Sequence, residues 1–130
     1  MLTNYFSLLA QSVEADGSVL SIVKLNPQCS VYEGHFPGNP VVPGVILCEI
    51  MAQSCTITML DALVDNLAVY RGIDDVKFKN TVRPGDLCEI TCRVEEKKAN
   101  LIRCTAKLEV GDKLCCRGTL TFALIPNKDL

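Results

Sequence analysis

The stretch GVILCEIMAQSCTITMLDALVD, residues 44–65, is the longest regular segment of the chain and decides its fold. It is apolar on nearly every face as far as Leu60, and Glu49 is its only charged residue over that length. A helix that is apolar all round has to be surrounded by other structure. A membrane span is not expected here, because the carboxylate of Glu49 and the amide of Gln53 would be costly in a bilayer core. The stretch therefore predicts a long helix buried inside the protein.

The segments on either side of this helix carry the period-two patterns of β-strands. Before it, Asp16-Gly17 separates the apolar runs 13–15 and 18–25, as in a two-residue hairpin. After it, apolar and charged residues alternate from Asp74 to Lys79. Three more strands are expected at residues 87–95, 101–110 and 113–124, and a short amphipathic helix is expected at residues 2–9.

This order of elements predicts an α+β fold in which an antiparallel sheet of about six strands wraps one long helix. Alternating βα units are absent from the pattern, which excludes a doubly wound parallel sheet. The 130 residues are expected to form one domain, residues 1–130, because two halves would each be too short to bury a core.

Composition excludes several classes of function. Apolar residues make up 48% and charged residues 22% of the chain, which excludes a disordered protein. A formal net charge of −2 argues against nucleic-acid binding through bulk electrostatics. The eight cysteines lie mostly inside apolar stretches, where thiols behave as small hydrophobes, and the N-terminus has no signal-peptide pattern. We therefore expect a reduced, cytoplasmic protein.

The chain contains one histidine, His35, and this limits the chemistry that it can perform. A histidine-rich metal site is excluded, and the absence of a CxxC motif argues against a zinc ribbon, so neither a metal nor a cofactor is expected. Motifs of serine hydrolases, P-loops and dinucleotide sites are also absent. His35 is the obvious candidate for acid–base chemistry near neutral pH.

Glu49 is the second residue that breaks a local rule, because burying an unpaired carboxylate is expensive. It should therefore take up a proton or find a partner, and such groups mark candidate functional sites. Pro43-Gly44 opens the helix that carries it, where free backbone N–H groups are available. Gln53 lies on the same helix face as Glu49. A base, an acid and oriented donors together suit proton abstraction next to a carbonyl group.

Two motifs resemble a known family. The run GHFPGNPVVPGV at residues 34–45, followed by EIMAQ at residues 49–53, resembles the signature of the FabZ-type β-hydroxyacyl-acyl-carrier-protein dehydratases. The segments GIDDVKF at 72–78 and VRPGD at 82–86 resemble the next segment of that family. The resemblance covers the chain from about residue 32 to residue 87 and implies the hot-dog fold, which agrees with the order of elements above.

The resemblance also implies an activity and its residues. His35 would remove the C2 proton of a 3-hydroxyacyl thioester, and Glu49 would assist loss of the 3-hydroxyl group as water. The Gly44 N–H would polarise the thioester carbonyl, Gln53 would orient Glu49 or a water molecule, and the substrate would also contact Phe36 and Val45. The family assembles as homodimers, often as hexamers, with histidine and acid from different subunits. Glu49, where related isomerising enzymes carry Asp, favours dehydration without isomerisation.

The implied partner is acyl carrier protein, a strongly acidic protein, with coenzyme A thioesters as the alternative carrier. A local basic patch would then be needed on a chain of net charge −2. The candidate patch consists of Arg71, Lys77, Lys79 and Arg83.

Two other functions remain open at this point: a hot-dog acyl thioesterase, and a non-catalytic acyl-binding or scaffold subunit. The chain also departs from the family, because residues 4–9 lack the His and Arg of the usual N-terminal segment. That departure leaves open the acyl chain length, hexamer formation, and whether the pathway is housekeeping fatty acid synthesis or an aryl-polyene or polyketide-like one.

Overall fold

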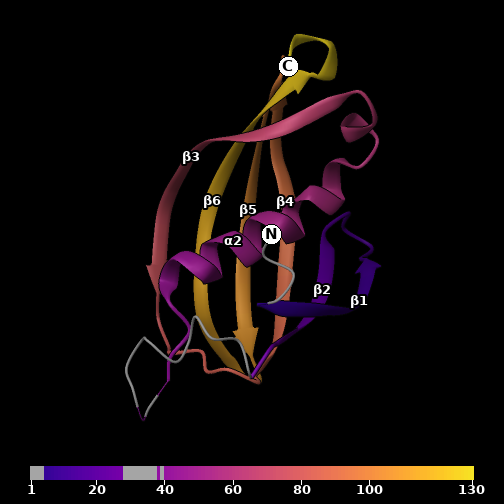
Figure 1. Cartoon of the computed structure of the whole chain (residues 1–130). Coiled ribbons are helices and arrows are strands. Elements are labelled where there is room, and N and C mark those ends of the chain that lie inside the picture. The colour runs from indigo at the N-terminus through magenta and orange to yellow at the C-terminus, as the bar shows by residue number, and fades with distance from the viewer. Residues whose placement is uncertain (1–4, 28–37, 39) are drawn as a thin grey trace.

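The computed structural model describes residues 5–27, 38 and 40–130. Its sheet is entirely antiparallel, with the strand order β1-β2-β4-β5-β6-β3. The strands are β1 (Phe6–Val13), β2 (Val19–Leu25), β3 (Asn66–Phe78), β4 (Leu87–Lys98), β5 (Leu101–Val110) and β6 (Lys113–Pro126). The helix α2 (Gly44–Cys55) crosses one face of this sheet, and β3 curves past the helix at the edge of the sheet beside β6 (Figure 1). The predicted α+β arrangement, one helix wrapped by an antiparallel sheet, is confirmed.

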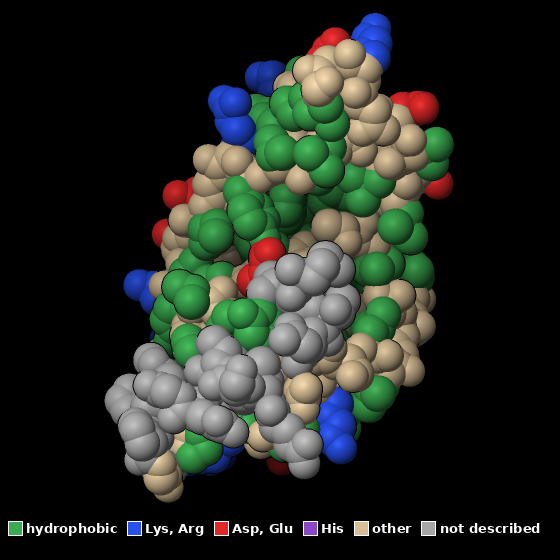
Figure 2. Space-filling view, in the orientation of Figure 1, with side chains coloured by type: hydrophobic (Ala, Val, Ile, Leu, Met, Phe, Trp, Pro, Cys, Tyr) green, Lys and Arg blue, Asp and Glu red, His purple; other side chains and the backbone are tan. Residues whose placement is uncertain are grey.

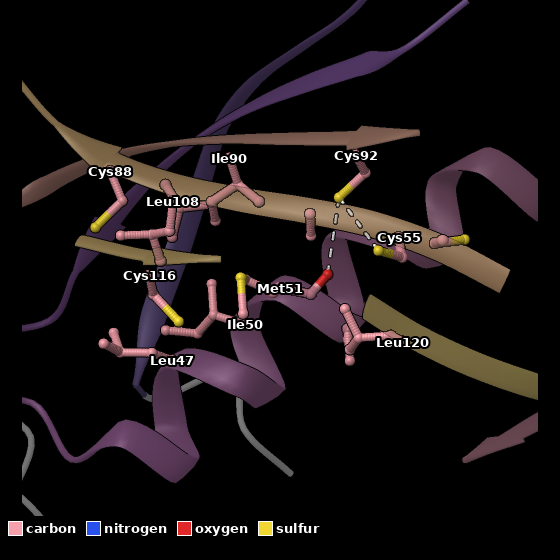
Figure 3. Packing of buried hydrophobic residues seen from close by; sticks show 14 of the residues in the cluster. Leu47, Ile50, Met51, Cys55, Cys88, Ile90, Cys92, Leu108, Cys116 and Leu120 are labelled. Carbon is pink, nitrogen blue, oxygen red and sulfur yellow. Dashed lines mark hydrogen bonds between the residues drawn. The ribbon is translucent and has the colours of Figure 1, made fainter. Parts of the chain in front are cut away.

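The core lies between α2 and the inner faces of the central strands. Ile50 and Met51 of the helix are at most 1% exposed, and they pack with buried residues of β4, β5 and β6 such as Leu108 and Leu120 (Figure 3). Inner-facing residues of β4 and β5 alternate with exposed ones, as expected for a sheet with one buried face. Burying a large apolar side chain contributes about 1.5–3 kcal/mol, so this layer supplies most of the stability.

The hairpins follow the predicted turns. Gly17 and Gly111, at the turns between β1 and β2 and between β5 and β6, have φ values of 87° and 59°. Residues with a side chain rarely adopt this left-handed backbone conformation, whereas glycine does so at no steric cost. Strand β5 begins and ends where the sequence predicted, at residues 101 and 110. Strands β4 and β6 begin as predicted and extend a few residues beyond their predicted ends.

The short helix predicted at residues 2–9 is wrong for the residues that the structure describes. Residues 6–13 form strand β1, which pairs with β2 from Phe6 opposite Leu25 to Val13 opposite Val19. An isolated two-turn helix is only marginally stable, whereas the hairpin gives the same backbone a ladder of hydrogen bonds.

The predicted helix is also too long at its C-terminal end. The α-helix stops at Cys55, and residues 56–59 and 62–64 form 3-10 turns. The hydroxyl groups of Thr56 and Thr58 each donate to the carbonyl three residues earlier, at 2.6 Å. Hydroxyl groups that bond the nearby backbone compete with regular helix, and β-branched residues such as Thr and Ile weaken it further.

Strand β3 is longer than predicted and contains two bulges. It begins at Asn66 rather than Asp74, and its pairing with β6 gains one extra residue between Tyr70 and Gly72 and another between Asp74 and Lys77. Asp75 in the second bulge has φ 53°. Asp74 pairs with Thr119 and Phe78 with Cys116, so they face opposite sides of the sheet, contrary to the simple alternation predicted.

Candidate active site

Two of the candidate residues, His35 and Phe36, lie outside the described residues. The other candidates are described, and they fall at both ends of α2 and along β3.

Gly44 begins α2 at an N-terminus that no described side chain caps. The N–H groups of Ile46 and Leu47 donate to the Pro43 carbonyl at 3.0 and 3.3 Å, which leaves the first two N–H groups of the helix for another acceptor. Just before this turn, the backbone is held in place because the N–H of Val42 donates to the Val82 carbonyl at 2.7 Å. This end of the helix therefore presents backbone donors from a fixed position, with the positive end of the helix dipole behind them.

The ring of Phe78, near the end of β3, lies directly over Gly44. A Cβ atom added at Gly44 would come within 2.8 Å of Phe78 Cζ, which is too close for a real contact. A side chain at this position would therefore force the ring of Phe78 to move. A hollow of about 440 Å³ opens beside this contact, lined by Gly44, Phe78, Lys79 and neighbouring apolar residues.

Glu49 lies one and a half turns further along α2 and is partly buried. Its Oε2 accepts a hydrogen bond from the hydroxyl group of Tyr70 on β3. The partner that the carboxyl group of Glu49 was expected to need is thus a neutral donor, the hydroxyl group of Tyr70. Glu49, Gln53 and Tyr70 line a second hollow of about 420 Å³, together with apolar residues of β3 and Phe122 of β6. Hydrophobic side chains gather on the coloured part of the face that carries α2 and β3, among backbone and polar atoms (Figure 2).

Tyr70 is held in place on its other side by an aromatic neighbour. Its ring centroid lies 5.6 Å from that of Phe122, with the two rings tilted by 42°. Burial, together with the hydrogen bond and the charge of Glu49, raises the pKa of the Tyr70 hydroxyl well above its usual value. The hydroxyl therefore stays protonated and acts as a donor over the whole neutral range.

The remaining predicted residues are not all brought together. Gln53 shares the hollow of Glu49, as the spacing of four residues predicted. Val45 is 76% exposed beside Gly44. Lys79 lines the hollow at Gly44, whereas Lys77 lines a separate hollow of about 610 Å³ on the outer face of the sheet. Arg83 binds the Pro40 carbonyl at 3.3 Å.

Sequence reasoning missed Tyr70 and Phe78 as residues of the site. A signal for Tyr70 was present, because the run LAVYRGI at 67–73 is rich in strand-forming residues and follows Asp65-Asn66. The position of Phe78 over Gly44 had no comparable signal, since it depends on how the second bulge of β3 turns the side chains.

The buried thiols lie behind the site rather than in it. Seven described cysteines are free, and the Sγ atoms of Cys55 and Cys92 lie 3.3 Å apart in the core (Figure 3). Burial raises the pKa of Cys88 and Cys116 to about 12, so these thiols stay protonated and unreactive. In the described part of the chain, no group of three or more ligating side chains is arranged to hold a metal ion. None of the helices in that part has the length and apolar character needed to cross a membrane.

Two comparisons with known proteins, one with family models and one with individual relatives, agree on one family. Residues 11–119 match a family model described as ApeI-like, ApeI dehydratase. The 3-hydroxyacyl-acyl-carrier-protein dehydratase FabZ of Natranaerobius thermophilus is 42% identical over 95 residues, which are 72% of this chain and 67% of that protein. The enzyme of the same name from Streptococcus mutans is 36% identical over 85% of this chain and 80% of its own length.

A solved structure extends the likeness to three dimensions. The dehydratase heterocomplex ApeI:P of Xenorhabdus doucetiae superposes with a TM-score of 0.71, covering 90% of this chain and 96% of the compared chain. The identity of 20% limits this likeness to the fold.

Proposed function

The chain belongs to the ApeI-like, FabZ-type dehydratase family, and on that premise we propose that it removes water from a 3-hydroxyacyl thioester carried by acyl carrier protein. The product is the trans-2-enoyl thioester, made in fatty acid biosynthesis or a related pathway. The family resemblance predicted from residues 34–53 and 72–86 is confirmed.

In the proposed reaction, His35 takes the C2 proton of the substrate. The electron pair of that C–H bond forms the C2–C3 double bond, and the C3–O bond breaks. The hydroxyl group leaves as water after taking a proton from the carboxyl group of Glu49, directly or through a bound water. Histidine and carboxyl group then exchange protons with solvent before the next turnover. General acid–base catalysis of this kind contributes about 10²- to 10⁴-fold.

The helix N-terminus supplies the third part of the proposed mechanism. Negative charge develops on the thioester oxygen when C2 loses its proton, and the backbone N–H of Gly44 is proposed to bind that oxygen. The absence of a side-chain cap at this helix end supports the role, because the donors are not already occupied by a described side chain. We further propose that Gln53 orients Glu49 or its water, and that Phe36 and Val45 contact the substrate.

The observation that carries the proposal is the setting of Glu49. It is the one carboxyl group on the described helix α2, it lines a hollow with Gln53, and a tyrosine hydroxyl holds one of its oxygens. A salt-bridged structural glutamate would instead face a cation, and Glu49 has no ion pair with a described residue.

We propose that the protein works as a homodimer with sites shared between subunits. Strand β3 supports this, because it lies at the edge of the sheet and carries large apolar side chains that are about half exposed. Those side chains are Leu67, Tyr70, Ile73 and Phe78. A long exposed edge of this kind favours pairing with another chain.

Docking of acyl carrier protein is proposed at the end of α2 that begins with Gly44. Lys79 supports this placement, because it is the basic member of the predicted patch that lines the hollow at Gly44. We expect Lys79→Glu to raise KM for the carrier-protein substrate and to leave KM for the coenzyme A thioester unchanged.

We propose that the protein works in the cytoplasm. The described cysteines are free, which is consistent with that reducing compartment.

The test is to incubate the protein with 3-hydroxyacyl carrier proteins of graded chain length and to follow the acyl group by mass spectrometry. We expect enoyl product from the wild type, and a loss of about 10²-fold or more for His35→Ala and Glu49→Gln. Release of free carrier thiol would indicate a thioesterase instead. Full activity of both variants would overturn the proposed roles.

Shared sites can be tested by mixing the two inactive variants. If each site takes histidine from one subunit and acid from the other, a heterodimer of His35→Ala and Glu49→Gln contains one intact site and one doubly altered site. Random exchange of subunits then restores about a quarter of the wild-type activity. No recovery after subunit exchange would place both residues in one subunit's site.

A further inference from the structure

Tyr70 lies immediately before a bulge in β3. It pairs with Phe122 of β6, and the next paired residue is Gly72, opposite Thr121, so that Arg71 is the extra residue. Phe122 and Leu120 both face the helix side of the sheet, and Tyr70 and Ile73 pair with them. Tyr70 thus faces α2 through the regular pairing that precedes the bulge, and the bulge brings Ile73, three residues later, onto the same face.

Two contacts fix the tyrosine side chain. Its ring packs on Phe122, which is 2% exposed and belongs to the core. Its hydroxyl donates to Oε2 of Glu49. A tyrosine has few rotatable bonds, so a packed ring places its hydroxyl oxygen with little freedom. The hydrogen bond from Tyr70 thus holds the side chain of Glu49, which otherwise has three rotatable bonds on an open helix face.

We propose that Tyr70 is the positioning residue of the catalytic carboxyl group: its hydroxyl occupies Oε2 of Glu49 and leaves Oε1 for the departing hydroxyl group. This inference rests on the proposed function of Glu49. Because Oε2 accepts from Tyr70, a proton carried by the carboxyl group sits on Oε1. The acid is therefore oriented before the substrate arrives, which lowers the barrier without any contact between Tyr70 and the substrate.

The direct test is Tyr70→Phe, which keeps the ring and its packing on Phe122 and removes only the hydroxyl group. A hydrogen bond to a charged or reacting group is worth enough to predict a fall in kcat of about 10- to 100-fold. KM and the melting temperature should stay close to the wild-type values. A merely structural role would lower the melting temperature and leave kcat per folded molecule unchanged, and that result would overturn the proposal.

A double-mutant cycle decides whether Tyr70 acts through Glu49. In the Glu49→Gln background, we expect Tyr70→Phe to cause no further loss, because the group that it positions no longer supplies the proton. An equal loss in both backgrounds would mean that Tyr70 acts independently of Glu49, and the proposal would be wrong. Tyr5→Phe, the same chemical change at the start of the chain, is the matched control and should leave kcat within about twofold.

The cycle also separates this proposal from the proposed function. If Glu49→Gln is fully active, the proposed function of Glu49 fails and the positioning role fails with it. If Glu49→Gln is impaired but Tyr70→Phe equals the wild type in kcat, the proposed function stands and only the role of Tyr70 is overturned.

Discussion

The two sides of helix α2 carry opposite kinds of side chain, although they belong to the same twelve residues. The core side, defined by Ile50, Met51 and Cys55, is at most 1% exposed and packs on the sheet. The β3 side, defined by Glu49 and Gln53, borders a hollow and the strand at the edge of the sheet, and the helix begins at Gly44 beside a second hollow.

Even the polar groups differ between the two sides. On the core side, the Ser54 hydroxyl donates to the Ile50 carbonyl at 2.9 Å, so it stays within the helix. On the β3 side, the carboxyl group of Glu49 reaches across to Tyr70. The helix is therefore held by one side and presents its chemistry on the other, so substitutions on the core side should affect stability and substitutions on the β3 side should affect activity.

Glu49→Gln is the change with the largest expected effect on the β3 side. We expect kcat to fall by about 10²- to 10⁴-fold, because an amide cannot supply the proton. The free energy of unfolding should change by less than about 1 kcal/mol, since the amide oxygen can still accept from Tyr70 and nothing apolar is lost. Urea unfolding and steady-state kinetics on one sample measure both quantities. A loss of stability comparable to that of a core residue would break the distinction between the sides.

Met51→Ala is the opposite case on the core side. Met51 is fully buried, and truncating such a residue leaves a cavity that costs about 2–5 kcal/mol of unfolding free energy. We expect kcat per folded molecule to stay within about twofold below the unfolding transition, because no reacting group moves. Val45→Ala is the control for stability alone, since Val45 lies on the same helix but is 76% exposed. A large loss of kcat in folded Met51→Ala would show that the two sides are coupled.

Gly44→Ala is expected to lower activity with little change in stability. The new Cβ meets the Phe78 ring, which must move away from the helix N-terminus. We expect kcat/KM to fall about tenfold, whereas the free energy of unfolding should change by less than about 1 kcal/mol, because Gly44 is the first residue of the helix and the half-exposed ring of Phe78 can move. Adding Phe78→Leu makes room for the Cβ, so the double variant should recover most of the activity. Failure of that recovery, with Phe78→Leu alone fully active, would mean that the contact is not the cause.

The sequence predicts the core side of α2 better than its β3 side, and the reason is physical. An apolar stretch opened by Pro43-Gly44 determines where the helix starts and that it is buried, because these are local or averaged properties. The helix end depends on the hydroxyl groups of Thr56 and Thr58, which bond the carbonyls of Gln53 and Cys55 in competition with backbone N–H groups. That competition is visible only when the backbone geometry is known.

The β3 side was harder to predict because it depends on the strand opposite. Glu49 and Gln53 stood out by their chemistry, and their common hollow followed from helical spacing. Tyr70 and Phe78 did not, because the strand was expected to begin only at Asp74, and because the second bulge of β3 puts Phe78 on the opposite face from Asp74. The roles of His35 and Phe36 remain predictions, because these residues lie outside the described part of the chain.

The smallest expected effect comes from Asp16, on the hairpin turn between β1 and β2, away from both sides of α2. Its Oδ1 accepts from the Ser18 hydroxyl at 2.6 Å and from the Ser18 N–H at 3.0 Å, and its Oδ2 pairs with Arg93. These contacts, above all the Ser18 hydroxyl, lower the pKa of Asp16 below its usual value of 3.8. The stabilisation is therefore complete above the unfolded pKa and is lost as the pH falls through the folded one.

We expect Asp16→Asn to be slightly less stable than the wild type at neutral pH, with kcat unchanged. The difference in stability should shrink as the pH falls below about 4, because the wild-type carboxylate then takes up a proton. Thermal unfolding at a series of pH values measures this. A difference that stays constant down to acidic pH would assign the effect to the shape of the turn rather than to the charge. A change in kcat would show that the sheet transmits the state of the hairpin to α2, and the separation between the two sides of the helix would no longer be local to it.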